Sequence, residues 1–252
     1  MNTIRTEVEE EIAWITFDRP EVRNAVSLEM VEELTHLLDQ YKQDAQVKVI
    51  VFTGANNVFV SGGDLDQLMR AKGKEEAFLL LSKIGEVLEK IDRYPKPTIA
   101  MINGAAIGGG CELAISCHFR FAADTAIMGF VQISMHITTG WGGGSRLLDK
   151  LNETDALTLL LTGKRIDAAE AMRLGFVQEV YPKEQLKEAV HSFASRIAEQ
   201  PLVGIESYMR LLEWKRSGMS KDERVNREIE QCASLWGSDE HTAVVQRFLH
   251  KR

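Results

Sequence analysis

The chain has 252 residues, of which 44% are hydrophobic and 27% charged, with a formal net charge of −7 and a pI of about 5.5. This length suits one large α/β domain or one domain with a helical appendage, and the composition is that of a globular protein with a sizeable core. Such an acidic chain is not expected to bind nucleic acid, which normally requires a basic face or stripe. A few local Lys or Arg side chains can still bind an anionic ligand.

The cysteines and the N-terminal residues indicate the cellular compartment of the protein. An odd number of cysteines without paired spacing (Cys111, Cys117 and Cys232) indicates reduced thiols. The opening sequence, MNTIRTEVEEE, is polar and acidic, unlike a secretory signal or an Arg-rich transit peptide. No apolar run approaches the roughly 20 residues needed to span a bilayer. We therefore expect a cytoplasmic protein with no membrane segment.

Short strands alternate with helices in the first part of the chain. β-Branched and aromatic residues predict strands at residues 12–17 and 47–53. Between them, Ser27 can cap a helix that runs to about residue 44 with apolar residues at i, i+3, i+4 spacing. A second amphipathic helix is predicted from about residue 75 to 94, before two prolines, and a buried strand at 98–102. This order predicts βα units with covered sheet faces.

From residue 153 onward the sequence becomes almost entirely helical. Helices are predicted at residues 153–162, 168–174, 183–199, 201–216, 221–236 and 239–250, and one strand at 176–180 interrupts them. We expect an α/β core over residues 1–190 and a helical oligomerisation region over residues 191–252. The apolar residues that suggest an interface are Val203, Ile205, Leu211, Leu212, Leu235 and Trp236.

Many of the 19 glycines gather in three segments, at residues 58–65, 103–113 and 139–146. The first two follow predicted strands. Glycines there let a ligand approach backbone N–H groups near the positive end of a helix. One such cluster is explained equally well by tight turns and close packing. Two strand–loop–helix clusters together favour two donors that converge on one ligand atom, as in an oxyanion hole.

Several other kinds of site are excluded or disfavoured. The chain has no Gly-x-Gly-x-x-Gly in a strand-to-helix turn, no Gly-x-x-x-x-Gly-Lys-Ser/Thr and no Gly-x-Ser-x-Gly, so a Rossmann enzyme, a P-loop and a serine hydrolase are unsupported. Ser145 and Cys111 lack a nearby base and are interpreted as packing residues. Five histidines lack metal-ligand spacing and are interpreted as structural: His36, His118, His191, His241 and His250. No metal is expected.

Six segments carry a resemblance to a known family. They are residues 18–25 (DRPEVRNA), 59–65 (FVSGGDL), 104–113 (GAAIGGGCEL), 141–147 (WGGGSRL), 161–168 (LTGKRIDA) and 175–180 (GFVQEV). In order and spacing they resemble the signatures of the crotonase (enoyl-CoA hydratase/isomerase) superfamily, from about residue 5 to the C-terminus. The stretch from Trp141 also resembles the ethylmalonyl-CoA decarboxylase-like branch.

The resemblance implies a crotonase-like α/β fold, a spiral of ββα units followed by a helical trimerisation region, with trimers often paired into hexamers. It implies an acyl-CoA substrate and no cofactor other than the coenzyme A of that substrate. The thioester oxygen would lie between the backbone N–H groups of Gly63 and Gly109; losing one such donor typically costs ~3 kcal/mol. Arg23 would lie near the CoA phosphates. Other residues implied in substrate binding are Ser61, Gly62, Asp64, Leu65 and Trp141, with Phe248 and Lys251 as candidates for the adenine.

The hydratases of this family use two glutamates. Glu112 matches the first, and a carboxyl there can act as general acid or base. The place of the second falls on Gln132, within a residue or two because of a short deletion, and no Asp or Glu lies between Asp124 and Asp149. Glutamine cannot transfer protons at neutral pH, so two-carboxylate hydration and one-base isomerisation are both in doubt. His136 stands where the family usually has glycine and is a weaker candidate proton donor.

We therefore expect a lyase that stabilises a thioester enolate, with Glu112 and Gln132 as catalytic residues. It would either hydrate a 2-enoyl-CoA, as in fatty acid metabolism, or decarboxylate a short carboxyacyl-CoA. The second reaction fits an oxyanion hole with one carboxyl. The alternatives are an enoyl-CoA isomerase and a non-catalytic acyl-CoA-binding homologue. A homotrimer or hexamer is expected, with no nucleic-acid or membrane partner.

Overall fold

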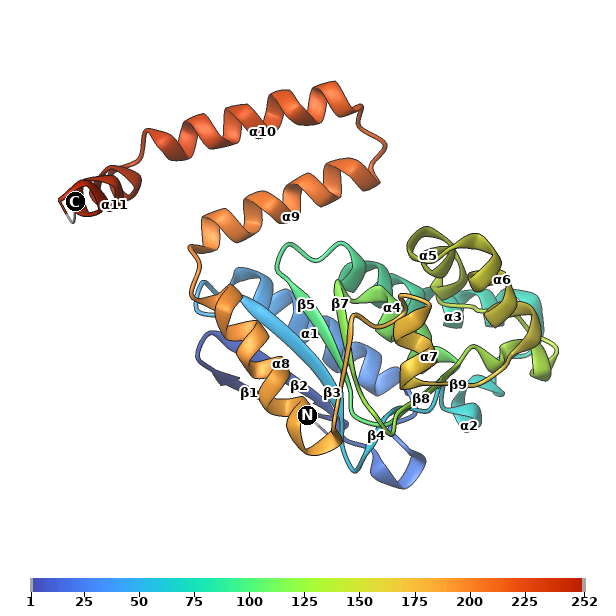
Figure 1. Ribbon diagram of the computed structural model, residues 1–252. Coiled ribbons are helices and arrows are strands. Elements are labelled where there is room, and N and C mark those ends of the chain that lie inside the picture. The colour runs from blue at the N-terminus through green and yellow to red at the C-terminus, as the bar shows by residue number, and fades with distance from the viewer. Residues whose placement is uncertain (1, 251–252) are drawn as a thin grey trace. The chain divides into compact units, whose positions relative to one another are not determined.

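The computed structural model describes residues 2–250, which form two compact units (Figure 1). The first unit ends at Leu202 and the second begins at Val203. The predicted boundary at residue 190 falls inside helix α8 (Lys183–Ala198), which belongs to the first unit. The rest of the chain is helical: α9 (Leu202–Arg216), α10 (Lys221–Trp236) and α11 (Asp239–Leu249).

The first unit is built on a six-stranded sheet with the order β1-β2-β3-β5-β7-β10. β1 and β2 are antiparallel, and the remaining pairs are parallel. Every residue of β3 and β5 is buried, as expected for parallel strands whose two faces are both covered. The strands are β1 (Ile4–Glu9), β2 (Ile12–Phe17), β3 (Val49–Gly54), β5 (Thr98–Ile102), β7 (Phe119–Ala123) and β10 (Glu179–Tyr181).

A smaller sheet has the order β4-β6-β8-β9. β4, β6 and β8 run parallel, and β9 closes the sheet antiparallel to β8. Along the chain, β3–β4, β5–β6 and β7–β8 each place one strand in the large sheet and the next in the small sheet before a helix follows. These are the repeated ββα units of the predicted crotonase-like spiral. The small strands are β4 (Val58–Val60), β6 (Ala105–Ile107), β8 (Ile127–Gly129) and β9 (Ile166–Asp167).

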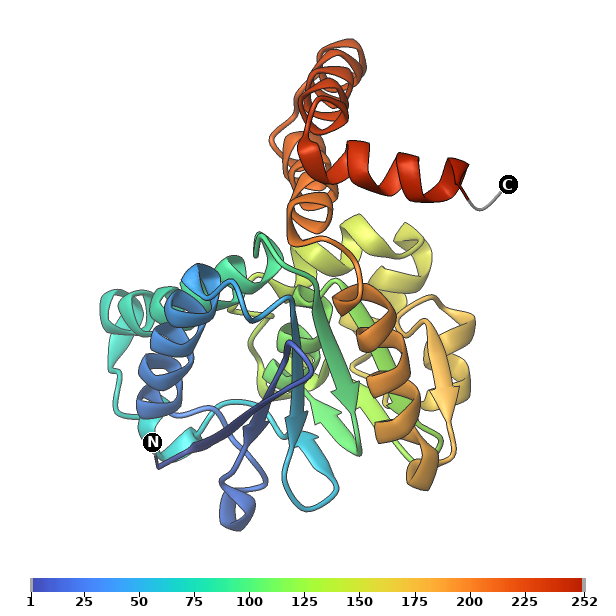
Figure 2. The same ribbon diagram turned by 90° about the vertical axis from the view of Figure 1, so that its left-hand side faces the viewer.

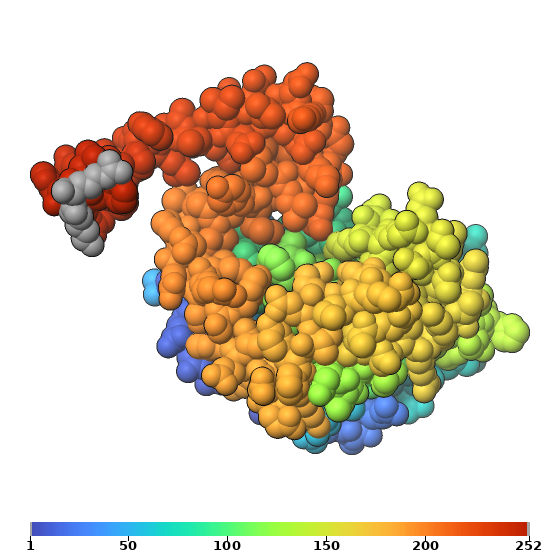
Figure 3. All heavy atoms as spheres, viewed as in Figure 1, coloured from blue at the N-terminus to red at the C-terminus, as the bar shows by residue number. Residues whose placement is uncertain are grey.

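Two long helices cover one side of the first unit. α1 (Leu28–Gln43) and α3 (Gly73–Asp92) pack side by side (Figure 2). Ser27 caps α1 as predicted, because its Oγ accepts the N–H of Met30 at 3.1 Å. α8 packs on strands of the large sheet. With α6 (Glu153–Thr162) and α7 (Ala168–Arg173), it forms much of the face of this unit seen in Figure 3.

Short helices position the glycine-rich segments. α4 (Gly109–Ser116) follows β6, and all 8 of its residues are buried. It packs against β4, β6, α3 and α5 (Gly143–Lys150). Three further short helices lie beside the turns: η1 (Pro20–Val22), α2 (Leu65–Leu68) and η2 (Val131–Met135). Among the helices of residues 2–250, none is long and apolar enough to cross a membrane.

The predicted strand at residues 176–180 is wrong in its bounds. The strand covers Glu179–Tyr181, and the residues before it fold back on α7, because the N–H groups of Phe176 and Val177 both donate to the carbonyl of Ala171. The side chains of Phe176 and Val177 are each 1% exposed, so their apolar character reflects the core and not strand pairing. The two-residue strand β9 also interrupts the helical part and was not predicted.

Candidate active site

The first glycine-rich turn follows β4 and runs beside Val26. The N–H of Val26 donates to the carbonyl of Gly62 at 2.8 Å, and the N–H of Asp64 donates to the carbonyl of Val26 at 2.9 Å. Successive N–H groups of an extended chain point to opposite sides. Because the Asp64 N–H faces Val26, the N–H of Gly63 points away from it.

The second glycine-rich turn leads into α4. Gly109 is the first residue of this helix, and the N–H groups of a first helical turn have no acceptor within the helix. A Cβ built on Gly62 would lie 3.8 Å from the backbone nitrogen of Gly109, so the two turns are neighbours. Among the backbone hydrogen bonds of the turns, loops and helix caps in residues 2–250, none is donated by Gly63 or Gly109.

The third glycine-rich segment joins the other two through Trp141, whose residue exposure is 4%. A Cβ built on Gly109 would lie 1.9 Å from Cζ3 of this indole, and one on Gly63 would lie 3.2 Å from its Cζ2. The ring therefore occupies the space that a side chain at Gly109 would need and lies in tight contact with Gly63. The indole leaves no room for a side chain at Gly109, and at Gly63 a Cβ would also meet Cδ1 of Leu68 at 2.3 Å.

Glu112 is buried at 2% exposure in the first half of α4. Its Oε2 accepts the N–H groups of Trp141 and Gly143, each at 2.9 Å. Its Oε1 accepts Nε2 of Gln132 at 2.9 Å and the N–H of Gly140 at 3.4 Å. Burial raises the pKa of Glu112 above its ordinary value, while these hydrogen bonds act in the opposite direction. A buried carboxyl group with a shifted pKa beside glycine-rich turns is a common feature of acid–base sites.

Gln132 lies in η2, next to Glu112. Its side chain donates Nε2 to Glu112, and its own Oε1 is buried without a hydrogen-bond partner among residues 2–250. The structure therefore brings together the two predicted catalytic residues. An amide occupies the position beside Glu112.

Of the predicted substrate-binding residues, Ser61 and Arg23 lie together. The N–H of Ser61 donates to the carbonyl of Arg23 at 3.2 Å, and its Oγ donates to the carbonyl of Val22, also at 3.2 Å. Arg23 is exposed, with a left-handed φ of 56° at the end of η1. The main chain of this exposed residue therefore lies beside the first glycine-rich turn.

Asp64 and Leu65 differ in environment. Asp64 is buried, forms an ion pair with Arg19 at 2.8 Å and caps α2 by accepting the N–H of Gln67. It holds the turn that carries Gly63. Leu65, the next residue, is 53% exposed. Phe248 is 62% exposed in α11, and Lys251 lies outside the described residues.

Two residues that the sequence reasoning missed hold these turns in place. Asn24 is fully buried with a φ of 57°, and its Nδ2 donates to the carbonyls of Ala55 and Val58. Arg146 donates Nη1 to the carbonyl of Trp141 at 2.9 Å and pairs with Glu89 of α3. Two sequence features could have identified them: Asn24 lies inside a turn motif, and Arg146 is a single arginine at the end of a glycine run.

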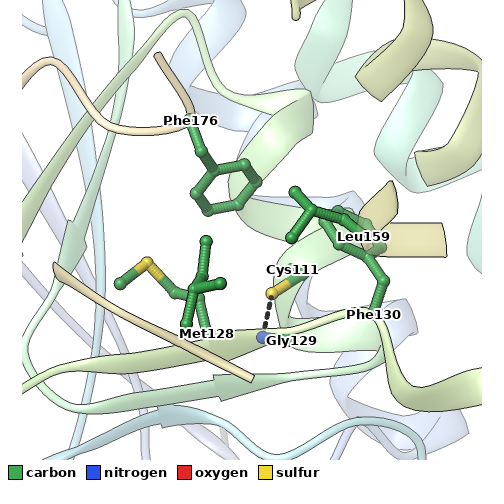
Figure 4. A pocket seen from close by; sticks show the side chains of 7 residues that line it. Cys111, Met128, Gly129, Phe130, Leu159 and Phe176 are labelled. Carbon is green, nitrogen blue, oxygen red and sulfur yellow. Dashed lines mark hydrogen bonds between the residues drawn. The ribbon is translucent and has the colours of Figure 1, made fainter. Parts of the chain in front are cut away.

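Cys111 and His136 were minor candidates. The Sγ of Cys111 donates to the carbonyl of Ala106 at 2.9 Å and accepts the N–H of Gly129, within a small apolar pocket (Figure 4). Burial raises the pKa of Cys111 to about 12, so it remains a thiol, as its interpretation as a packing residue implies. His136 is exposed at the end of η2. In the described part of the chain, no three His, Cys, Asp or Glu side chains are grouped as a metal site requires.

Comparison with known proteins gives the family. The family model for enoyl-CoA hydratase/isomerase matches residues 7–252. The chain belongs to the enoyl-CoA hydratase/isomerase family. This family member is 33% identical to a probable enoyl-CoA hydratase of Bacillus subtilis, over 100% of this chain and 97% of that protein. It is 31% identical to the short-chain-enoyl-CoA hydratase of Clostridium acetobutylicum, over 82% of this chain and 79% of that protein.

Solved structures of the family share its fold. The crystal structure of an enoyl-CoA hydratase from Bacillus anthracis matches with a TM-score of 0.92 at 29% identity, over 100% of this chain and 97% of that one. The predicted family and the predicted spiral of ββα units are therefore confirmed.

Proposed function

We propose that this family member is an acyl-CoA lyase that stabilises a thioester enolate with the N–H groups of Gly63 and Gly109. The two turns are neighbours, and the Gly109 N–H lies at the positive end of α4. Fixed donors aimed at a developing oxyanion lower the barrier without reorganisation during the reaction. In this proposal Arg23, which is exposed and whose carbonyl accepts the N–H of Ser61, binds the phosphates of coenzyme A.

Glu112 transfers the proton in this proposal, and Gln132 favours decarboxylation of a short carboxyacyl-CoA. The observation that carries this choice is the amide of Gln132, 2.9 Å from Glu112, where the two-glutamate mechanism needs a second carboxyl. In decarboxylation the bond from Cα to the carboxylate breaks, CO₂ leaves, and the electron pair forms the enolate. The enolate carbon then takes one proton, from Glu112. Burial, which raises the pKa of Glu112, favours the protonated acid that this step uses.

Hydration of a 2-enoyl-CoA is the second candidate, favoured by the names of the relatives. Here Glu112 would take a proton from water as the oxygen attacks the β-carbon. The same proton would then go to the α-carbon of the enolate. Gln132 would orient the water through its buried Oε1, but it cannot accept the proton.

The test is to incubate the purified protein with crotonyl-CoA, methylmalonyl-CoA and ethylmalonyl-CoA and to follow the products by mass. We expect the two carboxylated thioesters to lose the mass of CO₂. The variant Gln132→Glu should raise hydration relative to decarboxylation, because it restores the second carboxyl. Decarboxylation is rejected if the wild type hydrates crotonyl-CoA at about 10 s⁻¹ or faster and leaves the carboxylated thioesters unchanged. Failure to bind or convert any acyl-CoA rejects the lyase proposal as a whole.

A further inference from the structure

Trp141 is held from both sides of its main chain. Its N–H donates to Oε2 of Glu112 and its carbonyl accepts Nη1 of Arg146, each at 2.9 Å. Arg146 is itself paired with Glu89 of α3. The indole is therefore anchored at a fixed backbone position, unlike a side chain on a loop that can swing aside.

The same segment forms part of a groove of about 480 Å³ beside α3. A Cβ built on Gly85 of α3 would lie 3.9 Å from Cα of Trp141, whereas the ring reaches the opposite way, to Gly63 and Gly109. Trp141 thus stands between the groove and the two glycines. The groove is lined by Phe78, Leu81, Ser82, Glu86 and Glu89, together with residues 140–142 and Arg146.

We propose that the Trp141 indole is a wall of the acyl site and restricts the substrate to short acyl chains. This inference rests on the proposed function, because it assumes that the thioester oxygen lies at Gly63 and Gly109. A longer chain needs space beside these residues, and the ring occupies space close enough to exclude even a methyl group on Gly109. Removing the ring leaves space beside Gly63 and Gly109 that a longer acyl chain can occupy.

The size of the effect follows from apolar burial. Each buried methylene contributes about 0.8 kcal/mol, or about fourfold in affinity. Octanoyl-CoA carries four methylenes more than butanoyl-CoA. If only about half of them are buried in the space left by the ring, the preference for octanoyl-CoA should rise by about tenfold or more.

The experiment measures binding of butanoyl-CoA and octanoyl-CoA by calorimetry to the wild type, Trp141→Ala and Trp141→Phe. Both ligands share the coenzyme A moiety, so the ratio of their Kd values reports on the acyl site alone. We expect the wild type to prefer butanoyl-CoA, Trp141→Ala to shift the ratio about tenfold toward octanoyl-CoA, and Trp141→Phe to shift it less. Trp14→Phe, at a buried tryptophan of β2, is the control for loss of a large ring elsewhere.

An unchanged ratio in folded Trp141→Ala, or tighter binding of octanoyl-CoA by the wild type, overturns the inference. Circular dichroism establishes which variants are folded. If Trp141→Ala is unfolded, Trp141→Leu replaces it, since a branched apolar side chain fills part of the space while still freeing room. Wild-type protein that binds neither thioester overturns the proposed function, and this inference with it. Because the wild type alone gives that result, failure of the proposed function is distinguished from failure of this inference, which the ratio of the two Kd values tests.

Discussion

Helix α4 of the glycine-rich site and the last two helices, α10 and α11, differ in how much of their side chains is buried. All 8 residues of α4 are buried, and Glu112 within it accepts hydrogen bonds from Gln132 and from three backbone N–H groups. In α10 and α11 no residue is buried, and Ile229 and Trp236 are 61% and 69% exposed. Glu112 thus has its hydrogen-bond partners within its own chain, whereas these helices leave apolar side chains uncovered within the part of the chain that the structure describes.

The difference has a simple physical origin. α4 is apolar on nearly every side and must be surrounded, while α10 and α11 each carry one apolar stripe opposite a charged face. An amphipathic helix gains most of its stability by packing its apolar stripe against other apolar surface. We propose that other copies of this chain cover it, in the trimer or hexamer predicted from the sequence.

If Glu112 does the chemistry inside a self-contained site, Glu112→Gln should remove activity and leave the fold intact. The oxygen of the new amide can accept the N–H groups of Trp141 and Gly143, and its nitrogen can face Gln132, whose amide rotates to present Oε1. We expect kcat to fall about 10²–10⁴-fold, the usual contribution of a general acid or base. Steady-state kinetics and circular dichroism measure the two effects. The exposed Glu75→Gln in α3 is the matched control.

Gly109→Ala tests the packing that holds the two turns together. The added methyl would lie 1.9 Å from the Trp141 ring, so the start of α4 must move and carry its N–H with it. We expect a loss of about 3 kcal/mol in transition-state stabilisation, or about 10²-fold in kcat/KM. Overpacking should lower the free energy of unfolding by about 1–3 kcal/mol.

Gly204→Ala is the control for this substitution. A Cβ at Gly204 in α9 meets no atom within 4 Å, and alanine favours a helix by up to about 1 kcal/mol over glycine. Its urea midpoint should therefore stay the same or rise. A Gly109→Ala variant with wild-type kcat/KM and stability would show that the contact with Trp141 does not fix the donor.

The sequence predicted correctly those elements whose bounds depend on residues close together in the chain. The helices at residues 153–162 and 221–236 were predicted at their observed bounds, since Asn152 and Ser220 cap them through short-range hydrogen bonds. The pairing of Glu112 with Gln132 followed from family spacing. The ring of Trp141 over two glycines could not be predicted, because it depends on three turns that are far apart in the chain. The ion pair of Arg19 with Asp64 is non-local in the same way.

Substitutions in the uncovered helices should break the assembly and spare the site. Ile229→Glu combined with Trp236→Glu places two charges on apolar positions that would be buried between copies, and burying an unpaired charge is strongly unfavourable. We expect light scattering to give an oligomer for the wild type and a mass near 28.3 kDa for the variant. Glu228→Gln, at an exposed neighbouring position, is the control. A wild-type monomer at micromolar concentration would contradict the proposed oligomer.

The smallest expected effect is the pH dependence of stability that arises from Glu112. Burial raises its pKa in the folded state, so the native protein binds more protons than the unfolded chain between the two pKa values. Its stabilising contribution is therefore complete below the unfolded pKa and is lost as the pH rises through the folded pKa. The slope cannot exceed about 1.4 kcal/mol per pH unit for one proton.

The measurement is the difference in free energy of unfolding between the wild type and Glu112→Gln, taken by urea titration at several pH values. Other titrating groups contribute equally to both proteins, so the difference isolates Glu112. We expect the wild type to lose stability relative to Glu112→Gln as the pH rises above the ordinary carboxyl range. The difference in free energy of unfolding should then level off. A shift in the other direction would mean that the hydrogen bonds from Trp141, Gly143 and Gln132 outweigh burial. Glu112 would then be a fixed carboxylate, available to accept a proton and poorly suited to deliver one to an enolate.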